Sequence, residues 1–197
     1  DMNYDSVKAK KAWFFFDKEV VCLGAGISSN ASENIVTTIN QCWLSGKVKL
    51  FANGKATTVK NNYETNNANW VWHDSVGYFF HQPANVSVTA QKQKGSWSSI
   101  NASQPKEEVE GNVFKLWINH NSKPVDSSYA YSVMQGVAVT DMEHYQADEI
   151  IVLSNTKAFQ SVYHKKLDVF QSVFYRSGTI TINDLTITVN KPCVLLM

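Results

Sequence analysis

The side chains that could carry catalysis are few and scattered. The chain has five histidines, His73, His81, His120, His144 and His164. They match neither the His-x-x-x-His spacing of a helical metal site nor any paired metal spacing. His73 is followed by Asp74, but an adjacent carboxylate alone does not make a general base. The pattern Gly-x-Ser-x-Gly of a serine hydrolase is absent from the sequence. We therefore predict no catalytic residue, no metal site and no cofactor in this chain.

Aromatic residues give the clearer signal of binding. Trp70 and Trp72 fall on one face of a predicted strand, directly after Asn69 in an asparagine-rich stretch. Two such rings could form a flat surface for sugars, because aromatic faces offer apolar area while nearby polar groups reach hydroxyls. The alternative is that both rings pack between two sheets. Trp43 ends another predicted strand, where binding residues tend to sit.

Two other stretches favour structural roles. Four consecutive aromatic residues, Trp13 to Phe16, would point to both faces of a strand, which predicts burial between two layers. His120 lies at a strand-to-turn junction beside Asn119 and Asn121, where we expect it to hydrogen-bond locally. Neither stretch is therefore predicted to form a site.

The elements that position these residues are almost all strands. Apolar and polar residues alternate with a period of two in ranges 47–51, 56–59, 86–90, 114–118, 129–133, 150–153, 159–163, 169–174, 179–182 and 185–189. Asn53-Gly54 and Asn183-Asp184 predict hairpin turns. One short helix is predicted over Asp141–Ala147, capped by Thr140. Ranges 60–69 and 98–112 are expected to be loops.

Composition indicates a folded chain and excludes some partners. Of the 197 residues, 44% are hydrophobic and 18% are charged, and the net charge is +1. This balance gives no overall field for nucleic acid or for an anionic membrane, so we predict neither partner. No apolar run approaches the length of a membrane span. Of the three cysteines, Cys22 and Cys42 fall in apolar strand patterns and are expected to be buried free thiols.

Several stretches, in order along nearly the whole chain, together resemble one known family. They are Trp13–Ile27, Glu33–Trp43, Trp70–Phe80, Gln93–Trp97, Phe114–Tyr131 and Asn190–Cys193. The set is similar to the β half of the bacterial family 8 polysaccharide lyases, the chondroitin AC and hyaluronan lyases. No single motif decides the resemblance, which depends on the ordered set.

The resemblance implies a fold and a division into domains. The expected fold is all-β, a large antiparallel multi-sheet sandwich of the galactose-mutarotase-like kind, with at most one or two short helices. We expect one β-sandwich domain over residues 1–197, as a fragment without the N-terminal α/α toroid and without the C-terminal β domain of the family.

The resemblance also implies a function. Family members cleave acidic glycosaminoglycans by β-elimination at uronic acid, with catalytic residues mainly in the toroid. We expect this chain to supply scaffold and part of the cleft for chondroitin sulfate or hyaluronan, beside a missing toroid, in a secreted or periplasmic protein. Trp43 and Trp70 are the predicted substrate contacts, with Trp72 and Asn69 behind them. The alternative is a stand-alone carbohydrate-binding module without lyase activity.

Overall fold

The structure is a computed structural model that describes residues 6–197. Its strands are β1 (Lys8–Phe15), β2 (Glu19–Ser28), β3 (Asn34–Trp43), β4 (Val48–Ala52), β5 (Lys55–Val59), β6 (Asn61–Thr65), β7 (Ala68–His73), β8 (Val76–Phe80), β9 (Val86–Gly95), β10 (Val109–Ser122), β11 (Ser127–Gln135), β12 (Ile150–Asn155), β13 (Phe159–His164), β14 (Val169–Phe174), β15 (Gly178–Ile182), β16 (Leu185–Val189) and β17 (Cys193–Leu196). The helical segments are α1 (Val139–Glu143) and the 3₁₀ turns η2 (Trp97–Ser99) and η3 (Ala147–Glu149). The prediction of an all-β fold with little helix is confirmed.

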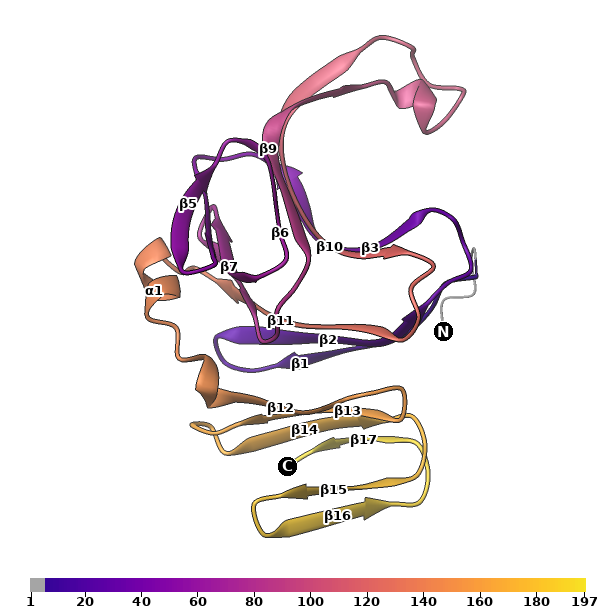
Figure 1. The fold of residues 1–197 in the computed structure, drawn as a ribbon, viewed down its shortest axis with the longest axis vertical. Coiled ribbons are helices and arrows are strands. Elements are labelled where there is room, and N and C mark those ends of the chain that lie inside the picture. The colour runs from indigo at the N-terminus through magenta and orange to yellow at the C-terminus, as the bar shows by residue number, and fades with distance from the viewer. Residues whose placement is uncertain (1–5) are drawn as a thin grey trace.

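The strands form four antiparallel sheets stacked as layers (Figure 1). Sheet A has the order β1-β2-β11-β8-β7-β4-β5, and sheet B has the order β3-β10-β9-β6. Sheet C has the order β12-β13-β14-β17, and sheet D is the hairpin β15-β16. The layers follow one another as B, A, C and D, while the β9–β10 hairpin projects beyond them (Figure 1).

Sheet A is covered on both faces, and this explains the nearly continuous apolar sequence of β2. Cys22 belongs to the core cluster that sheet A shares with sheet B, including Phe114 and Leu116 of β10. Val21 and Leu23, on the opposite face, pack in a cluster with Val162 of sheet C. Successive side chains of a strand point to opposite faces, so a strand between two layers must be apolar on both.

Local sequence explains the turns better than the loops. Asn53 has a φ of 53° and Gly54 of 74°, and the two join β4 to β5 as predicted. The hairpin at Asn183-Asp184, between β15 and β16, is also confirmed. The predicted loop over residues 60–69 is wrong, because β6 and the start of β7 lie there. Only part of the loop predicted over 98–112 is present, since β10 already begins at Val109.

The remaining differences concern helix α1, the aromatic run and the thiols. The helix begins at Val139 and not at Asp141, and the Asp141 carboxylate accepts the Ala138 N–H at 2.7 Å, so Thr140 is not the cap. Phe14 is buried, but Phe15 is 69% exposed because β1 is an edge strand of sheet A. Cys22 is buried as predicted, whereas Cys42 is exposed. No helix of the described residues is long and apolar enough to cross a membrane.

Candidate functional site

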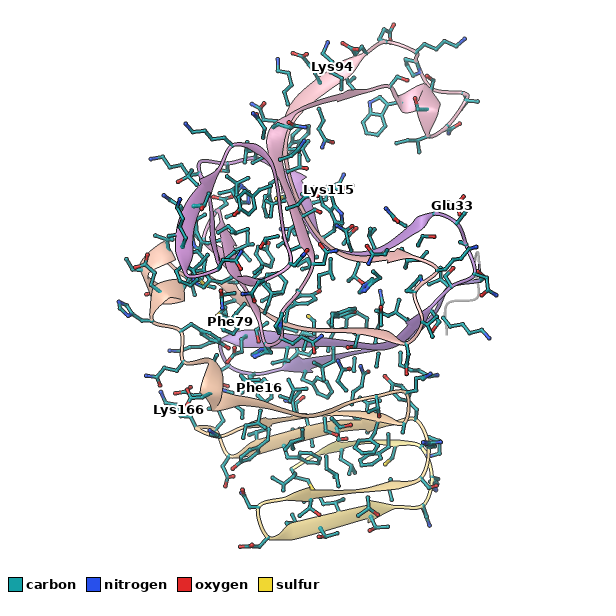
Figure 2. The ribbon with its side chains drawn as sticks, viewed as in Figure 1. Phe16, Glu33, Phe79, Lys94, Lys115 and Lys166 are labelled. Atoms are coloured by element: carbon teal, nitrogen blue, oxygen red, sulfur yellow. The ribbon has the colours of Figure 1, made fainter. Side chains whose placement is uncertain are left out.

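The outer face of sheet B carries the aromatic and amide side chains best placed to meet a ligand. Strand β10 turns Phe114, Leu116 and Ile118 into the core that sheet B shares with sheet A. The residues between them, Lys115 and Trp117, therefore lie on the opposite face. Figure 2 shows Lys115 on β10, and its Nζ atom lies 5.0 Å from the centroid of the Trp117 ring. We call this surface the outer face.

Trp43 stands on the outer face at the end of β3. Its Cα is paired in register with that of Val113 on β10, and its side chain is 73% exposed. The ring rests over Gly111, where an added Cβ would lie 2.1 Å from the Trp43 Cζ3 atom. Because Gly111 has no side chain, the indole can lie directly on the strand, and we call this contact the seat of Trp43. Most of the ring stays open to solvent. An exposed indole fixed in this way is suited to stacking against a sugar ring.

Gly111→Ala tests whether this seat positions Trp43. The added methyl group should displace the indole, because the two would overlap at 2.1 Å. We expect a changed Trp43 fluorescence with little loss of stability, since the ring can move into solvent. The measurement is tryptophan emission in a Trp97→Phe background, together with urea denaturation. An unchanged spectrum would contradict the proposed seat.

The other predicted site residues lie elsewhere. Trp70 is 4% exposed and clusters with Met134 and Met142 under α1. Trp72 is partly buried in the same cluster, and its Nε1 donates a hydrogen bond to the Val137 carbonyl at 2.8 Å. Trp70 and Trp72 thus share one face, as the alternation predicts, but the segment around α1 covers it. This cover comes from residues about 65 positions further along the chain, which no local pattern reveals.

Asn69 is exposed, but it does not stand beside Trp43. It belongs to β7 in sheet A, whereas Trp43 belongs to β3 in sheet B. The four predicted site residues are therefore not brought together on one surface. Trp117 and Lys115 were not among the predicted site residues. The signal that could have found them is the alternation of β10, which leaves them opposite the apolar residues.

The buried histidines hold the sandwich together. His73 stacks on Phe114 with 4.3 Å between ring centroids, and its Nε2 accepts the Ser45 N–H at 3.0 Å. Burial lowers the pKa of His73. His120 is buried against Thr37, with 2.9 Å between its Nε2 and the threonine Oγ1. His120 therefore has the structural role that was predicted, but its partner Thr37 lies 83 positions earlier in the sequence and is not the local partner that was expected. Neither ring lies on the outer face.

Comparison with known proteins places the chain in a family. The model of the polysaccharide lyase family 8 super-sandwich domain matches residues 1–146. The model of the C-terminal β-sandwich domain of the same family matches residues 151–197. The chain belongs to polysaccharide lyase family 8. The resemblance noted in the sequence is thereby confirmed.

Individual family 8 relatives are much longer than this chain. Chondroitinase-AC of Pedobacter heparinus is 48% identical over 201 residues, which cover 100% of this chain and 28% of that protein. Xanthan lyase of a Bacillus species is 31% identical, covering 94% of this chain and 22% of the relative. A solved structure of chondroitinase AC lyase with oligosaccharides superposes with a TM-score of 0.90 at 46% identity, covering 99% of this chain and 29% of that one.

Within this family 8 chain, one further cluster of polar residues lies where the two matched regions are in contact. Glu19, at the start of β2, accepts a hydrogen bond from the Tyr145 hydroxyl, and its Oε1 lies 3.6 Å from Nε2 of His164. The three residues line a cavity of about 1120 Å³. Phe16 and Lys166 line the same cavity, at one end of the layers (Figure 2). Burial and the Glu19 carboxylate raise the pKa of Tyr145, which keeps its phenol protonated and able to donate.

Proposed function

We propose that this chain is the carbohydrate-facing β part of a glycosaminoglycan lyase that cleaves chondroitin or hyaluronan by β-elimination at uronic acid. Membership in family 8 supports the reaction class, since the relatives include a chondroitinase and hyaluronate lyases. The observation that carries the role of this chain is the exposed indole of Trp43, seated on Gly111. In this proposal the chain supplies scaffold and part of the substrate-binding surface.

The chemistry itself is assigned to parts of the parent enzyme outside these residues. β-Elimination removes the proton beside the uronate carboxylate, and that proton is weakly acidic until the negative charge is neutralised. Catalysis therefore needs cationic or hydrogen-bonding groups next to a base. In the described part of the chain, the outer face offers Lys115 beside Trp117 but no histidine to act as that base. We propose that the α/α toroid implied by the family resemblance provides these groups.

Substrate contact is proposed for Trp43 above the other predicted residues. The Trp70 side chain is almost fully buried, and the indole N–H of Trp72 already donates a hydrogen bond to the Val137 carbonyl. We propose that these two tryptophans and Asn69 act behind the contact surface, with Trp70 and Trp72 anchoring the α1 segment on sheet A. Lys115 supplies a local cation near Trp117, which suits an acidic polymer.

Trp43→Ala in the full-length enzyme should raise the KM for chondroitin by about 3- to 10-fold and leave kcat nearly unchanged. Loss of one aromatic stacking contact is worth about 0.5–1.5 kcal/mol, and a contact made equally in the ground and transition states affects mainly KM. Trp97→Ala is the matched control, because Trp97 is also exposed but belongs to the projecting β9–β10 hairpin. Steady-state kinetics with an unchanged KM for Trp43→Ala would rule out the contact.

The rival proposal is a stand-alone carbohydrate-binding module. It is favoured by the fact that the Trp43 surface is fully formed by β3 and β10 of this chain. A module should bind chondroitin or hyaluronan oligosaccharides when isolated, whereas half of a cleft should bind them poorly. Fluorescence titration of the isolated chain separates the two. We also propose a secreted or periplasmic location, on the family resemblance, which fractionation of producing cells would test.

A further inference from the structure

A groove of about 830 Å³ lies on the outer face of sheet B, beside Trp117. Residues of β3, β6 and β10 and the turns near positions 53 and 66 line it. Seven of its twelve lining residues are asparagines, among them Asn34, Asn67 and Asn119. We call it the asparagine groove. Its size falls within the range of small-ligand sites, roughly 300–1,000 Å³.

Some of these asparagines are explained by the backbone, but Asn119 is not. Asn53 and Asn121 have φ angles of 53° and 62°, a left-handed conformation that asparagine tolerates better than most residues. Asn119 lies within the strand β10, a position from which asparagine is usually depleted. Its presence there calls for a reason other than strand propensity.

Hydrogen bonds hold the Asn119 amide in a fixed orientation. The Trp117 Nε1 donates to the Asn119 Oδ1 at 3.0 Å, and the Asn119 Nδ2 donates to the Ser87 Oγ at 2.7 Å. The Ser87 hydroxyl in turn donates to the Glu64 Oε1 at 3.3 Å. These hydrogen bonds cross β10, β9 and β6 and fix the Trp117 indole edge, the Asn119 amide and the Glu64 carboxylate relative to one another. Such preorganisation lowers the entropy that binding must overcome.

The lining of the groove is unsuited to an anionic ligand. Glu64 is its one carboxylate, and none of its twelve lining residues is a lysine or an arginine. A uronate or sulfate group would meet Glu64 without a compensating cation. Lys115 is held over the Trp117 ring and does not line the groove. Amide groups, by contrast, both donate and accept hydrogen bonds and so match the adjacent hydroxyls of a neutral sugar.

We infer that the asparagine groove binds an uncharged, hydroxyl-rich oligosaccharide. The amides would pair with its hydroxyl groups, and Trp117 and Val36 would contact its apolar faces. This inference goes beyond the proposed function, which concerns an acidic polymer at Trp43. The two sites share the outer face but differ in charge, so they select different sugars.

Calorimetric titration of the 197-residue chain with three neutral trisaccharides tests the inference. The probes are the trimer of N-acetylglucosamine, cellotriose and maltotriose, with a chondroitin tetrasaccharide as the charged comparator. At least one neutral probe should bind saturably at millimolar or lower concentration, which is about 4 kcal/mol of binding free energy or more. Its affinity should change less than about twofold between low and high salt, because no ion pair is made.

Variants locate the binding to the groove. Asn119→Ala should weaken binding of the neutral probe by about fivefold or more, because it removes the amide that links Trp117 to Ser87 and would pair with a sugar hydroxyl. Asn119→Ser, which keeps a small polar group in the strand, should weaken it less. Gln93→Ala is the matched control, since Gln93 is an exposed amide of β9 outside the groove. Thermal melting establishes that each variant is folded.

Three results would overturn the inference. The first is that no neutral probe binds saturably. The second is that Asn119→Ala binds the neutral probe as tightly as the parent chain does, and the third is that the groove binds the chondroitin probe more tightly than any neutral probe. The outcome is separable from that of the lyase proposal. Trp43→Ala is scored by turnover of an acidic polymer, whereas this titration is scored by binding of neutral sugars. Either proposal can fail while the other stands.

Discussion

Acidification from pH 6.5 towards pH 4 is expected to destabilise the folded chain strongly. Burial lowers the pKa of His81 to about 4, and burial together with the charge of Lys11 lowers that of His120 to about 4. Each ring also lies within hydrogen-bond distance of a hydroxyl group, His81 of Ser132 at 2.7 Å and His120 of Thr37 at 2.9 Å. In the unfolded chain each histidine would take up a proton near pH 6.5.

These pKa values determine the direction in which the stability changes with pH. The stabilisation is fully present above the unfolded pKa of 6.5, and it is lost as the pH falls towards the folded pKa of about 4. Each histidine adds a slope of about 1.4 kcal/mol per pH unit in this window, so the loss reaches several kcal/mol. Urea denaturation at steps between pH 7 and pH 4.5 measures the slope.

His120→Gln provides the internal check on this prediction. Glutamine can still hydrogen-bond Thr37 but does not titrate, so the slope should fall by about 1.4 kcal/mol per pH unit. The variant should also be less stable than the parent chain at pH 7 through imperfect packing against Tyr129, whose ring centroid is 6.2 Å from that of His120. An unchanged slope in a folded variant would show that His120 does not take part in the acid response.

The fold was predictable where short-range chemistry determines it. Asn53-Gly54 favours the left-handed turn that a tight hairpin needs, and the alternation on either side sets the register of β4 and β5. In the same way, the alternation of β10 separates a buried face from an exposed one. Trp43 was found because it is an aromatic residue at the end of a strand, which is also where the structure leaves it exposed.

What could not be predicted depends on the stacking of layers. Trp70 and Trp72 share a face, but only the position of α1, set by the chain beyond β11, decides that this face is covered. The exposure of Phe15 depends on β1 being an edge strand, which the order of strands in sheet A determines. The seat of Trp43 depends on a glycine 68 positions later in the sequence. The periodicity of apolar residues predicts strands and their faces, but it does not show which distant parts of the chain pack together.

The boundary between two domains was also not predictable from local residue patterns. The sequence shows no linker between the helix predicted over Asp141–Ala147 and the strand predicted over 150–153, so we expected one domain. The family models nevertheless assign residues 1–146 to the super-sandwich domain and residues 151–197 to the C-terminal β-sandwich domain. Sheet C packs directly on sheet A through Phe14, Leu23 and Val162, which hides the boundary from a search for exposed linkers.

The contact between those two regions leads to the second large expected effect. Glu19 is 8% exposed and accepts the Tyr145 hydroxyl, while His164 of β13 faces it at 3.6 Å. The His164 Nδ1 accepts the Leu167 N–H at 3.4 Å, so its Nε2 is the nitrogen that carries a proton towards Glu19. The carboxylate thus joins β2, the segment after α1, and sheet C.

Glu19→Ala should therefore lower the free energy of unfolding by about 3 kcal/mol or more, because it removes the buried carboxylate that accepts the Tyr145 hydroxyl and faces the His164 Nε2 atom. Tyr145→Phe removes one hydrogen bond and should cost only about 1 kcal/mol. Glu143→Ala, at an exposed position of α1, is the control and should stay within about 0.5 kcal/mol. Urea denaturation of the three variants gives the order. Equal effects of Glu19→Ala and Glu143→Ala would mean that the buried carboxylate does not tie sheet C to sheet A.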